Sequence, residues 1–170
     1  MHLSTIESTK SIFQSRLTTL EHLLQSAHTH FNGSESFLQK RIVADMLPLG
    51  TQIAFVCNQP RNFALWCVGK PMDNLNPEVT TLAQAYAHIA NTRGLVSNVN
   101  TEDSSFEEVT RIDIGKGTYL EVPSSHYVDE FLMPNFYFHL VTAYDILRMA
   151  GVSIGKQDYM MHLASSVRRA

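Results

Sequence analysis

Apolar residues in the first part of the chain recur at the spacing of an amphipathic helix. Between positions 6 and 27 they are separated by three, four or seven residues, which places their side chains on one face of a helix of about 25 residues. These positions are Ile6, Phe13, Leu17, Leu20, Leu24 and Ala27. The sequence Asn32-Gly33-Ser34 follows and is a typical stop signal. We therefore predict one long helix that ends before this tripeptide.

The next segment, residues 36–68, keeps helical spacing but contains two prolines. Its apolar positions are Leu38, Ile42, Met46, Leu49, Ile53, Val56, Phe63 and Cys67. Because proline lacks a backbone N–H and crowds the preceding turn, Pro48 and Pro60 must interrupt or bend a helix. We predict a short helix to about Asp45, a break at residues 46–47, and a main helix with Pro48 in its first turn and a bend at Pro60.

A third helix is expected to begin at Asn76-Pro77-Glu78. Asparagine is a good helix cap, proline fits the first helical position, and an acidic residue is favourable near the positive helix end. The buried face would be formed by Val79, Leu82, Ala83, Tyr86, Ile89 and Ala90. Gly94 is the expected stop of this helix.

The period of the pattern changes from helix to strand over residues 108–122. Apolar or β-branched residues alternate with polar ones on both sides of Gly115-Lys116-Gly117, which is the pattern of a short β-hairpin with a glycine turn. An isolated hairpin is only marginally stable in water, so this one must pack against the helices.

A last long helix is expected from about His126 to Ala150. Ser124 or Ser125 can cap it, and Gly151 ends it.

These elements predict an all-α fold, a four-helix bundle with a short β-hairpin between helices 3 and 4. The length of 170 residues is that of about one domain, so residues 1–170 are expected to form a single domain. In such bundles, functional sites are built from side chains that face the bundle core.

Composition narrows the possible partners and the cellular location. The net charge is −3 and no clustered basic face is evident, so no nucleic-acid partner is expected. No apolar run approaches the roughly 18 residues that a membrane span needs, so no membrane partner is expected. The N-terminus lacks a secretion signal, which indicates a cytoplasmic protein.

Cys57 and Cys67 would lie about 15 Å apart on one helix, too far for a disulfide, and are expected to be buried reduced thiols.

Two blocks of sequence resemble an uncharacterised branch of the DinB/YfiT-like superfamily, a domain of unknown function. The C-terminal block consists of Leu132-Met133-Pro134-Asn135-Phe136-Tyr137-Phe138-His139, Thr142-Ala143-Tyr144, Leu147-Arg148, Gly151-Val152 and Gly155-Lys156-x-Asp158-Tyr159. The supporting block consists of Arg41, Asp45-Met46-x-Pro48-Leu49 and Gln52. Together with the order of the elements, the resemblance covers nearly the whole chain and implies a DinB-like bundle that forms a homodimer through helix faces.

The resemblance also implies a position for a metal site. Several members of the superfamily bind a divalent metal through three histidines, one on helix 2 and two on helix 4, and some are transferases or isomerases that use low-molecular-weight thiols. Carried over residue by residue, the three positions fall on Gln59, Asn135 and His139. Amide oxygens are weak ligands for zinc, which favours imidazole and thiolate. No cofactor is therefore expected, and His139 is the one candidate ligand if zinc or nickel binds.

Two functions follow as alternatives. The first is a small-ligand-binding or non-enzymatic bundle with a degenerate metal site, whose pocket is lined by Gln59, Asn135, His139 and Tyr144. The second is a divalent-metal-dependent thiol transferase or isomerase that uses His139, and no further catalytic residue is assigned.

The sequence leaves open whether other residues replace the missing metal ligands. It also leaves open whether the candidate site residues have structural roles instead. Cys57, Glu130 and Asp45 are the substitute ligands that the second function would need. His139 could instead be a hydrogen-bonded residue of the bundle, and Asn135 could satisfy a backbone carbonyl freed by the neighbouring proline. Asp45 and Arg148 are a candidate ion pair.

Overall fold

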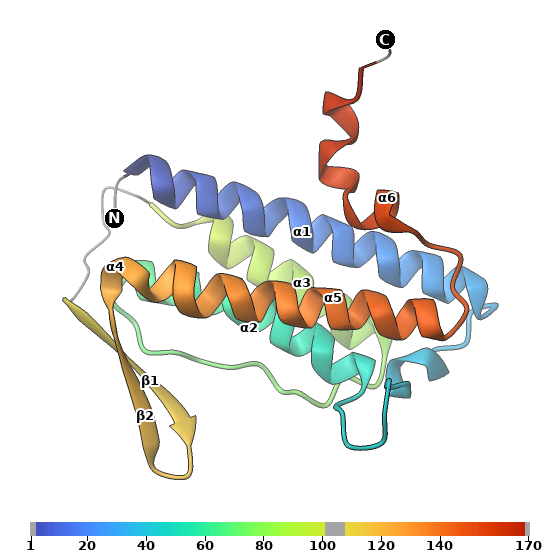
Figure 1. Ribbon diagram of the computed structural model, residues 1–170, viewed down its shortest axis with the longest axis horizontal. Helices are drawn as coiled ribbons and strands as arrows, with labels where there is room; N and C mark the ends of the chain where they lie inside the picture. The colour runs from blue at the N-terminus through green and yellow to red at the C-terminus, as the bar shows by residue number, and fades with distance from the viewer. Residues whose placement is uncertain (1–2, 101–107, 169–170) are drawn as a thin grey trace.

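Four long helices form a bundle in the computed structural model, which describes residues 3–100 and 108–168 (Figure 1). They are α1 (Leu3–His30), α2 (Leu49–Cys67), α3 (Leu82–Ser97) and α5 (Met133–Met149). A two-stranded antiparallel hairpin lies between α3 and α5 in the chain. The structure thus confirms the helical bundle and the position of the hairpin.

Phe13 on α1 lies at the centre of the hydrophobic core. Its ring centroid is 5.5 Å from that of Phe63 on α2 and 4.9 Å from that of Phe136 on α5, the latter edge to face. All three side chains are fully buried. One residue of the predicted stripe therefore joins three of the helices, because aromatic rings provide large contact areas with specific geometry.

The end of α1 agrees with the sequence. The helix stops at His30, and the next residues include Asn32 and Gly33 with φ of 52° and 85°. This left-handed conformation is accessible to glycine and asparagine, and it turns the chain away from the helix axis.

The predicted short helix to Asp45 is wrong. Only one 3₁₀ turn forms there, η1 (Ser36–Gln39), and the next helix begins at Leu49. Residues 41–45 are exposed, so the apolar side chain of Ile42 has no core to pack against, and a short helix without tertiary contacts is unstable. Pro48 immediately precedes α2 in an extended conformation instead of lying in its first turn.

Helix α3 starts later and ends later than the sequence suggested. Thr81 caps it in a reciprocal capping box with Gln84. The Asn76 side chain instead accepts a hydrogen bond from the backbone N–H of Glu78, which makes a local turn. Gly94 lies inside the helix, which continues to Ser97.

The connection from α2 to α3 follows the surface of α2 in an extended conformation (Figure 1). Two buried asparagines of α2 hold it in place. Asn58 Oδ1 accepts a hydrogen bond from the backbone N–H of Leu75 at 2.8 Å. Asn62 Oδ1 accepts from the N–H of Asp73 at 3.1 Å, and its Nδ2 donates to Asn74 Oδ1 at 2.9 Å.

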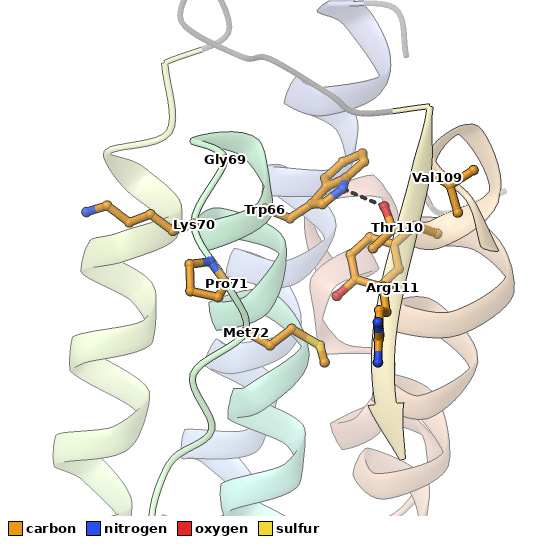
Figure 2. Close-up of a pocket in the computed structure, with 9 residues that line it drawn as sticks. Trp66, Gly69, Lys70, Pro71, Met72, Val109, Thr110 and Arg111 are labelled. Atoms are coloured by element: carbon orange, nitrogen blue, oxygen red, sulfur yellow. Dashed lines mark hydrogen bonds between the residues drawn. The ribbon is translucent and has the colours of Figure 1, made fainter. Parts of the chain in front are cut away.

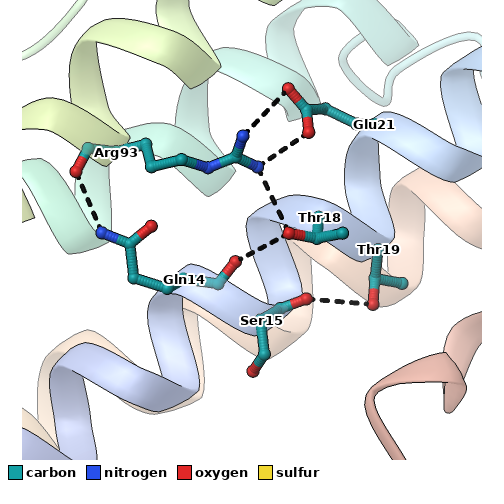
Figure 3. Close-up of polar contacts among 6 residues, drawn as sticks. All are labelled: Gln14, Ser15, Thr18, Thr19, Glu21 and Arg93. Carbon is teal, nitrogen blue, oxygen red and sulfur yellow. Dashed lines mark hydrogen bonds and ion pairs between the residues drawn. The ribbon is translucent and has the colours of Figure 1, made fainter. Parts of the chain in front are cut away.

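Polar contacts join α1 to α3 on the side away from the core. The two terminal guanidinium nitrogens of Arg93 reach the Glu21 carboxylate, the closer pair at 2.7 Å (Figure 3). Gln14 donates to the backbone carbonyl of Arg93 at 2.9 Å. A two-point arginine–carboxylate contact fixes orientation as well as distance.

The hairpin consists of β1 (Val109–Gly115) and β2 (Thr118–Pro123). Lys116 and Gly117 connect the strands with φ of 53° and 73°, as the two-residue turn favoured in hairpins requires. Ile112, midway along β1, is buried, whereas most of the hairpin projects from the bundle (Figure 1).

The last long helix begins with two short segments, α4 (Ser124–His126) and the π-helical turn η2 (Tyr127–Leu132), which lead into α5. Ser124 is the first residue of α4, and its hydroxyl lies 2.7 Å from that of Thr110 instead of capping the helix. After α5 the backbone N–H of Val152 bonds to the carbonyl of Leu147, with Gly151 at φ 89°. This is the glycine-dependent helix end that the sequence predicted.

Two short segments follow. They are α6 (Lys156–Tyr159) and η3 (Met161–Ser166), and α6 contacts α1 through His22 and Asp158 at 2.7 Å.

Gly50 provides a test of the contact between α2 and the α2–α3 connection. A Cβ atom on Gly50 would lie 1.9 Å from the carbonyl oxygen of Val79, whereas one on Gly94 would meet nothing within 4 Å. We expect Gly50→Ala to lower the free energy of unfolding by about 2 kcal/mol or more, because the backbone must move apart. Gly94→Ala should raise it by about 0.5–1 kcal/mol through helix propensity. Urea denaturation of both variants checks this, and equal effects of the two substitutions would contradict the close approach.

Candidate functional site

His139 lies on α5 and its imidazole contacts α2. Its Nδ1 is 2.8 Å from Oε1 of Gln52, and its ring lies 5.0 Å from that of Phe55, edge to face. The Nε2 amide of Gln52 donates to the carbonyl of Leu47 at 3.3 Å. That contact assigns the oxygen of Gln52 to the histidine, so Nδ1 carries the proton and donates it.

The charge state of His139 follows from its burial. Removal from water disfavours the imidazolium and lowers the pKa of His139 to about 4. The ring is therefore neutral at physiological pH, with a hydrogen-bonded Nδ1–H and a lone pair on Nε2.

Asn135 hydrogen-bonds to its own helix. Its Nδ2 donates to the carbonyl of Phe131 at 2.7 Å, one turn earlier. This carbonyl belongs to the π-helical turn before Pro134, next to the Glu130 carbonyl to which proline cannot donate. The bond agrees with the backbone interpretation of Asn135, while ligand contact stays a prediction.

Gln59 lies on the side of α2 that faces α5. The helices run antiparallel, since Gln52 contacts His139 while Trp66 contacts Tyr127, and this register places Gln59 opposite the first turn of α5, which contains Asn135. The Gln59 amide donates to the carbonyl of Phe55 at 3.3 Å. Its Oε1 is buried and has no hydrogen-bond partner among the residues that the structure describes.

Tyr144 occupies a different place from the other three predicted pocket residues. Its ring packs edge to face on Tyr159 of α6 at 5.8 Å, whereas His139 contacts α2. Within the described ranges no hydrogen bond or ring contact joins Tyr144 to Gln59, Asn135 or His139. The structure therefore sets Tyr144 apart from His139, while a common pocket of Gln59, Asn135 and His139 stays a prediction.

The substitute ligands do not gather around His139. Glu130 is exposed and pairs with His126 at 2.8 Å, and Asp45 is exposed. Cys57 is fully buried, and burial raises its pKa to about 12. In the part of the chain that the structure describes, no three His, Cys, Asp or Glu side chains are grouped as metal ligands.

Two further expectations have definite outcomes. Arg148 donates to the backbone carbonyl of Val152 at 3.3 Å, and the ion pair expected between it and Asp45 does not form. Cys57 and Cys67 are both buried and free, as expected.

A cavity that the sequence analysis did not identify lies at the other end of α2. It has a volume of about 350 Å³ and is enclosed by the end of α2, the start of the α2–α3 connection, β1 and η2 (Figure 2). The lining residues are Trp66, Gly69, Lys70, Pro71, Met72, Val109, Thr110, Arg111 and Tyr127. The single tryptophan of the chain is the one sequence signal that could have drawn attention to this region.

A second, more open and polar depression of about 420 Å³ lies between the last turns of α1 and the segment after α5. His22, Gln25, Ser26, Thr29, His30 and Ser153 line it.

The comparison with known proteins agrees with this arrangement. A family model described as "Domain of unknown function (DUF1993)" matches residues 6–160. The chain belongs to this family. A crystal structure of a DinB family member protein from Shewanella denitrificans has a TM-score of 0.77 and 24% sequence identity, and the alignment covers 94% of this chain and 96% of that chain. No curated protein matches the chain.

These findings confirm the resemblance to an uncharacterised DinB-like branch. The Shewanella protein shows that this DUF1993 member has the DinB-like fold. In residues 3–100 and 108–168 no helix combines the length and apolar character needed to cross a membrane.

The lowered pKa of His139 predicts a pH dependence of stability. Between pH 6.5, the usual pKa of histidine, and pH 4, the unfolded chain takes up a proton that folded His139 does not. The unfolded state then binds more protons, so the free energy of unfolding falls as the pH falls through this window. We expect His139→Gln to reduce the loss between pH 7 and pH 4 by about 2 kcal/mol.

Urea denaturation at a series of pH values measures this difference. His88→Gln on α3 serves as the control for loss of a histidine elsewhere. Parallel pH profiles for the natural chain and His139→Gln would contradict a neutral, half-buried His139.

Proposed function

We propose that this chain is a small-ligand-binding, non-enzymatic DinB-like bundle in which the metal site of the superfamily is degenerate. The observation that supports this most directly is the set of donors at Gln59, Asn135 and His139. Two of the three positions hold neutral amides, and the third holds an imidazole whose Nδ1 is engaged by Gln52.

The donor set does not fit zinc or nickel. Both amide nitrogens donate to backbone carbonyls of their own helices, so each amide can offer only a neutral oxygen. Neutral oxygens suit hard cations that collect many such ligands, whereas zinc sites use imidazole, thiolate or carboxylate. His139 alone offers such a ligand at this position.

The same residues favour ligand binding over an inert core. The buried Oε1 of Gln59 has no partner in the described part of the chain, and an unpaired buried acceptor is costly. A ligand with a hydrogen-bond donor would remove that cost. The cytoplasmic location belongs to this proposal and is supported by two buried, unpaired thiols.

Metal binding tests this function. Protein prepared without a histidine tag should contain far less than one metal ion per chain, and calorimetry with micromolar zinc or nickel should show no binding. Gln59→His with Asn135→His rebuilds the three-histidine pattern and should gain tight binding, because it supplies the missing imidazoles. Gln39→His with Asn98→His, at exposed positions, is the matched control.

The opposite outcome supports the transferase or isomerase alternative. Stoichiometric metal in the natural chain, lost in His139→Ala without a change in melting temperature, would overturn the proposed function. Thiol chemistry would then need an external thiol, since burial raises the pKa of Cys57 and Cys67 to about 12.

Assembly as a homodimer is a second part of the proposal. Three large apolar side chains on one face of α5 are exposed, namely Phe138 at 61%, Val141 at 39% and Met149 at 53%. A row of apolar residues on a helix surface favours contact with a second copy of the chain.

Light scattering checks the oligomeric state. The natural chain should have the mass of a dimer, and Phe138→Glu should shift it toward the monomer by placing a charge in the contact. Val167→Glu, in the exposed C-terminal segment, should leave the mass unchanged. A monomeric natural chain would contradict the dimer.

A further inference from the structure

The cavity at the end of α2 has the size and the walls of a binding pocket. Its volume of about 350 Å³ falls in the range of roughly 300–1,000 Å³ found for small-molecule sites. An engineered cavity of about 150 Å³ already holds a benzene molecule, so there is room for a ring with a short side chain. None of the nine lining residues belongs to the Gln59, Asn135 and His139 set.

Aromatic and aliphatic side chains form the walls. The rings of Trp66 and Tyr127 are 5.3 Å apart at an angle of 56°, and Pro71, Met72 and Val109 also line the cavity. Trp66 Nε1 donates to Thr110 Oγ1 at 3.0 Å, which fixes the indole against β1 (Figure 2). Rigid aromatic walls favour a ligand with a flat apolar body.

The hydroxyl of Tyr127 lacks a partner in this wall. The Tyr127 side chain is fully buried, and its hydroxyl has no hydrogen-bond partner among the described residues. Buried polar groups are nearly always paired, because an unpaired one loses its bonds to water without replacement. Burial also raises the pKa of Tyr127 above its usual range, so the hydroxyl keeps its proton and can donate.

Arg111 supplies a positive charge at the same cavity. Its guanidinium lies over the ring of Tyr119 at 3.7 Å and makes no ion pair within the described ranges, although Glu121 is its cross-strand neighbour. Figure 2 shows Met72 extending toward Arg111, while the side chain of Lys70 points away from both. The cavity therefore has the charge of Arg111 beside it, whereas the other nearby cation, Lys70, is directed elsewhere.

We propose that this cavity binds a small amphipathic carboxylic acid, with its flat apolar body against Trp66 and Tyr127 and its carboxylate held by Arg111 and the Tyr127 hydroxyl. Arginine suits this role because its planar fork matches a carboxylate. That a ligand is bound rests on the proposed ligand-binding function. The location and the chemical class of the ligand rest on the cavity.

The first test uses 3-phenylpropanoate as the probe and its neutral amide as the comparison. Trp66 is the only tryptophan and lies in the wall, so its fluorescence reports occupancy directly. We expect saturable binding of one acid per chain, confirmed by calorimetry, and about tenfold weaker binding of the amide, because a hydrogen bond to a charged group is the stronger one.

Substitutions assign the contacts. Arg111→Gln should weaken binding of the acid about tenfold and leave binding of the amide nearly unchanged. Lys70→Gln removes the same charge beside the cavity and should change the affinity less than about twofold. Tyr127→Phe should weaken binding about threefold or more, while its melting temperature stays equal to that of the natural chain or rises.

Three results would overturn the proposal. One is the absence of any saturable change with millimolar acid; another is equal affinity for acid and amide; the third is an equal loss in Lys70→Gln and Arg111→Gln. Arg111 lies on the exposed hairpin, so its variant keeps the test valid if Tyr127→Phe does not fold. If the acid does not bind and the protein contains no metal, the proposed function stands and its ligand binds elsewhere. Stoichiometric metal in the protein would refute that function independently.

Discussion

Helix α2 is surrounded by other parts of the protein along most of its length, and much of the structure follows from that constraint. Thirteen of its 19 residues are buried, including Gln52, Asn58 and Asn62. Buried amides must find hydrogen-bond partners, because a lost bond to water is costly. Each therefore determines where a neighbouring segment lies: Gln52 engages His139 of α5, and the two asparagines hold the α2–α3 connection.

The cavity is a consequence of the same arrangement. Gly50 allows the far end of the α2–α3 connection to approach α2 closely, and Asn62 fixes it near Asp73. Before it reaches these two points, the α2–α3 connection passes the last turn of α2. There Trp66 also holds β1 through its hydrogen bond to Thr110. Three segments that are distant in the sequence thus meet around one tryptophan because α2 determines the position of each.

Structural features that depend on the local backbone could be predicted from the sequence, and features that depend on distant partners could not. Gly33 and Gly151 end their helices because their own conformation requires it, and the Lys116-Gly117 turn follows the same logic. Residues 41–45 continue the helical spacing but have no core beside them, so the pattern alone was misleading. The start of α3 also depends on context, because Thr81 makes the capping box.

The candidate site residues divide in the same way, into those that could be predicted from the sequence and those that could not. The positions Asn135 and His139 could be carried over because both belong to one motif on α5, and Gln59 because the superfamily pattern expects a histidine on helix 2. The partner of His139 could not be found, because Gln52 is 87 residues away in the chain. The lining of the cavity comes from α2, the connection, β1 and η2, and no spacing rule relates Trp66 to Tyr127.

The contrast between His139 and Tyr127 indicates which polar group of the bundle is free to bind a ligand. Both present polar groups at the contact between α2 and the last long helix, but His139 has a partner and Tyr127 has none in the described structure. Gln59 also keeps an unpaired oxygen, yet only Tyr127 combines an unpaired atom with a place in the wall of one of the two described cavities. A paired polar group stabilises the fold, whereas an unpaired one lowers stability until something binds it. On this argument the end of α2 beside Tyr127 is better suited to binding a ligand than the paired His139 is.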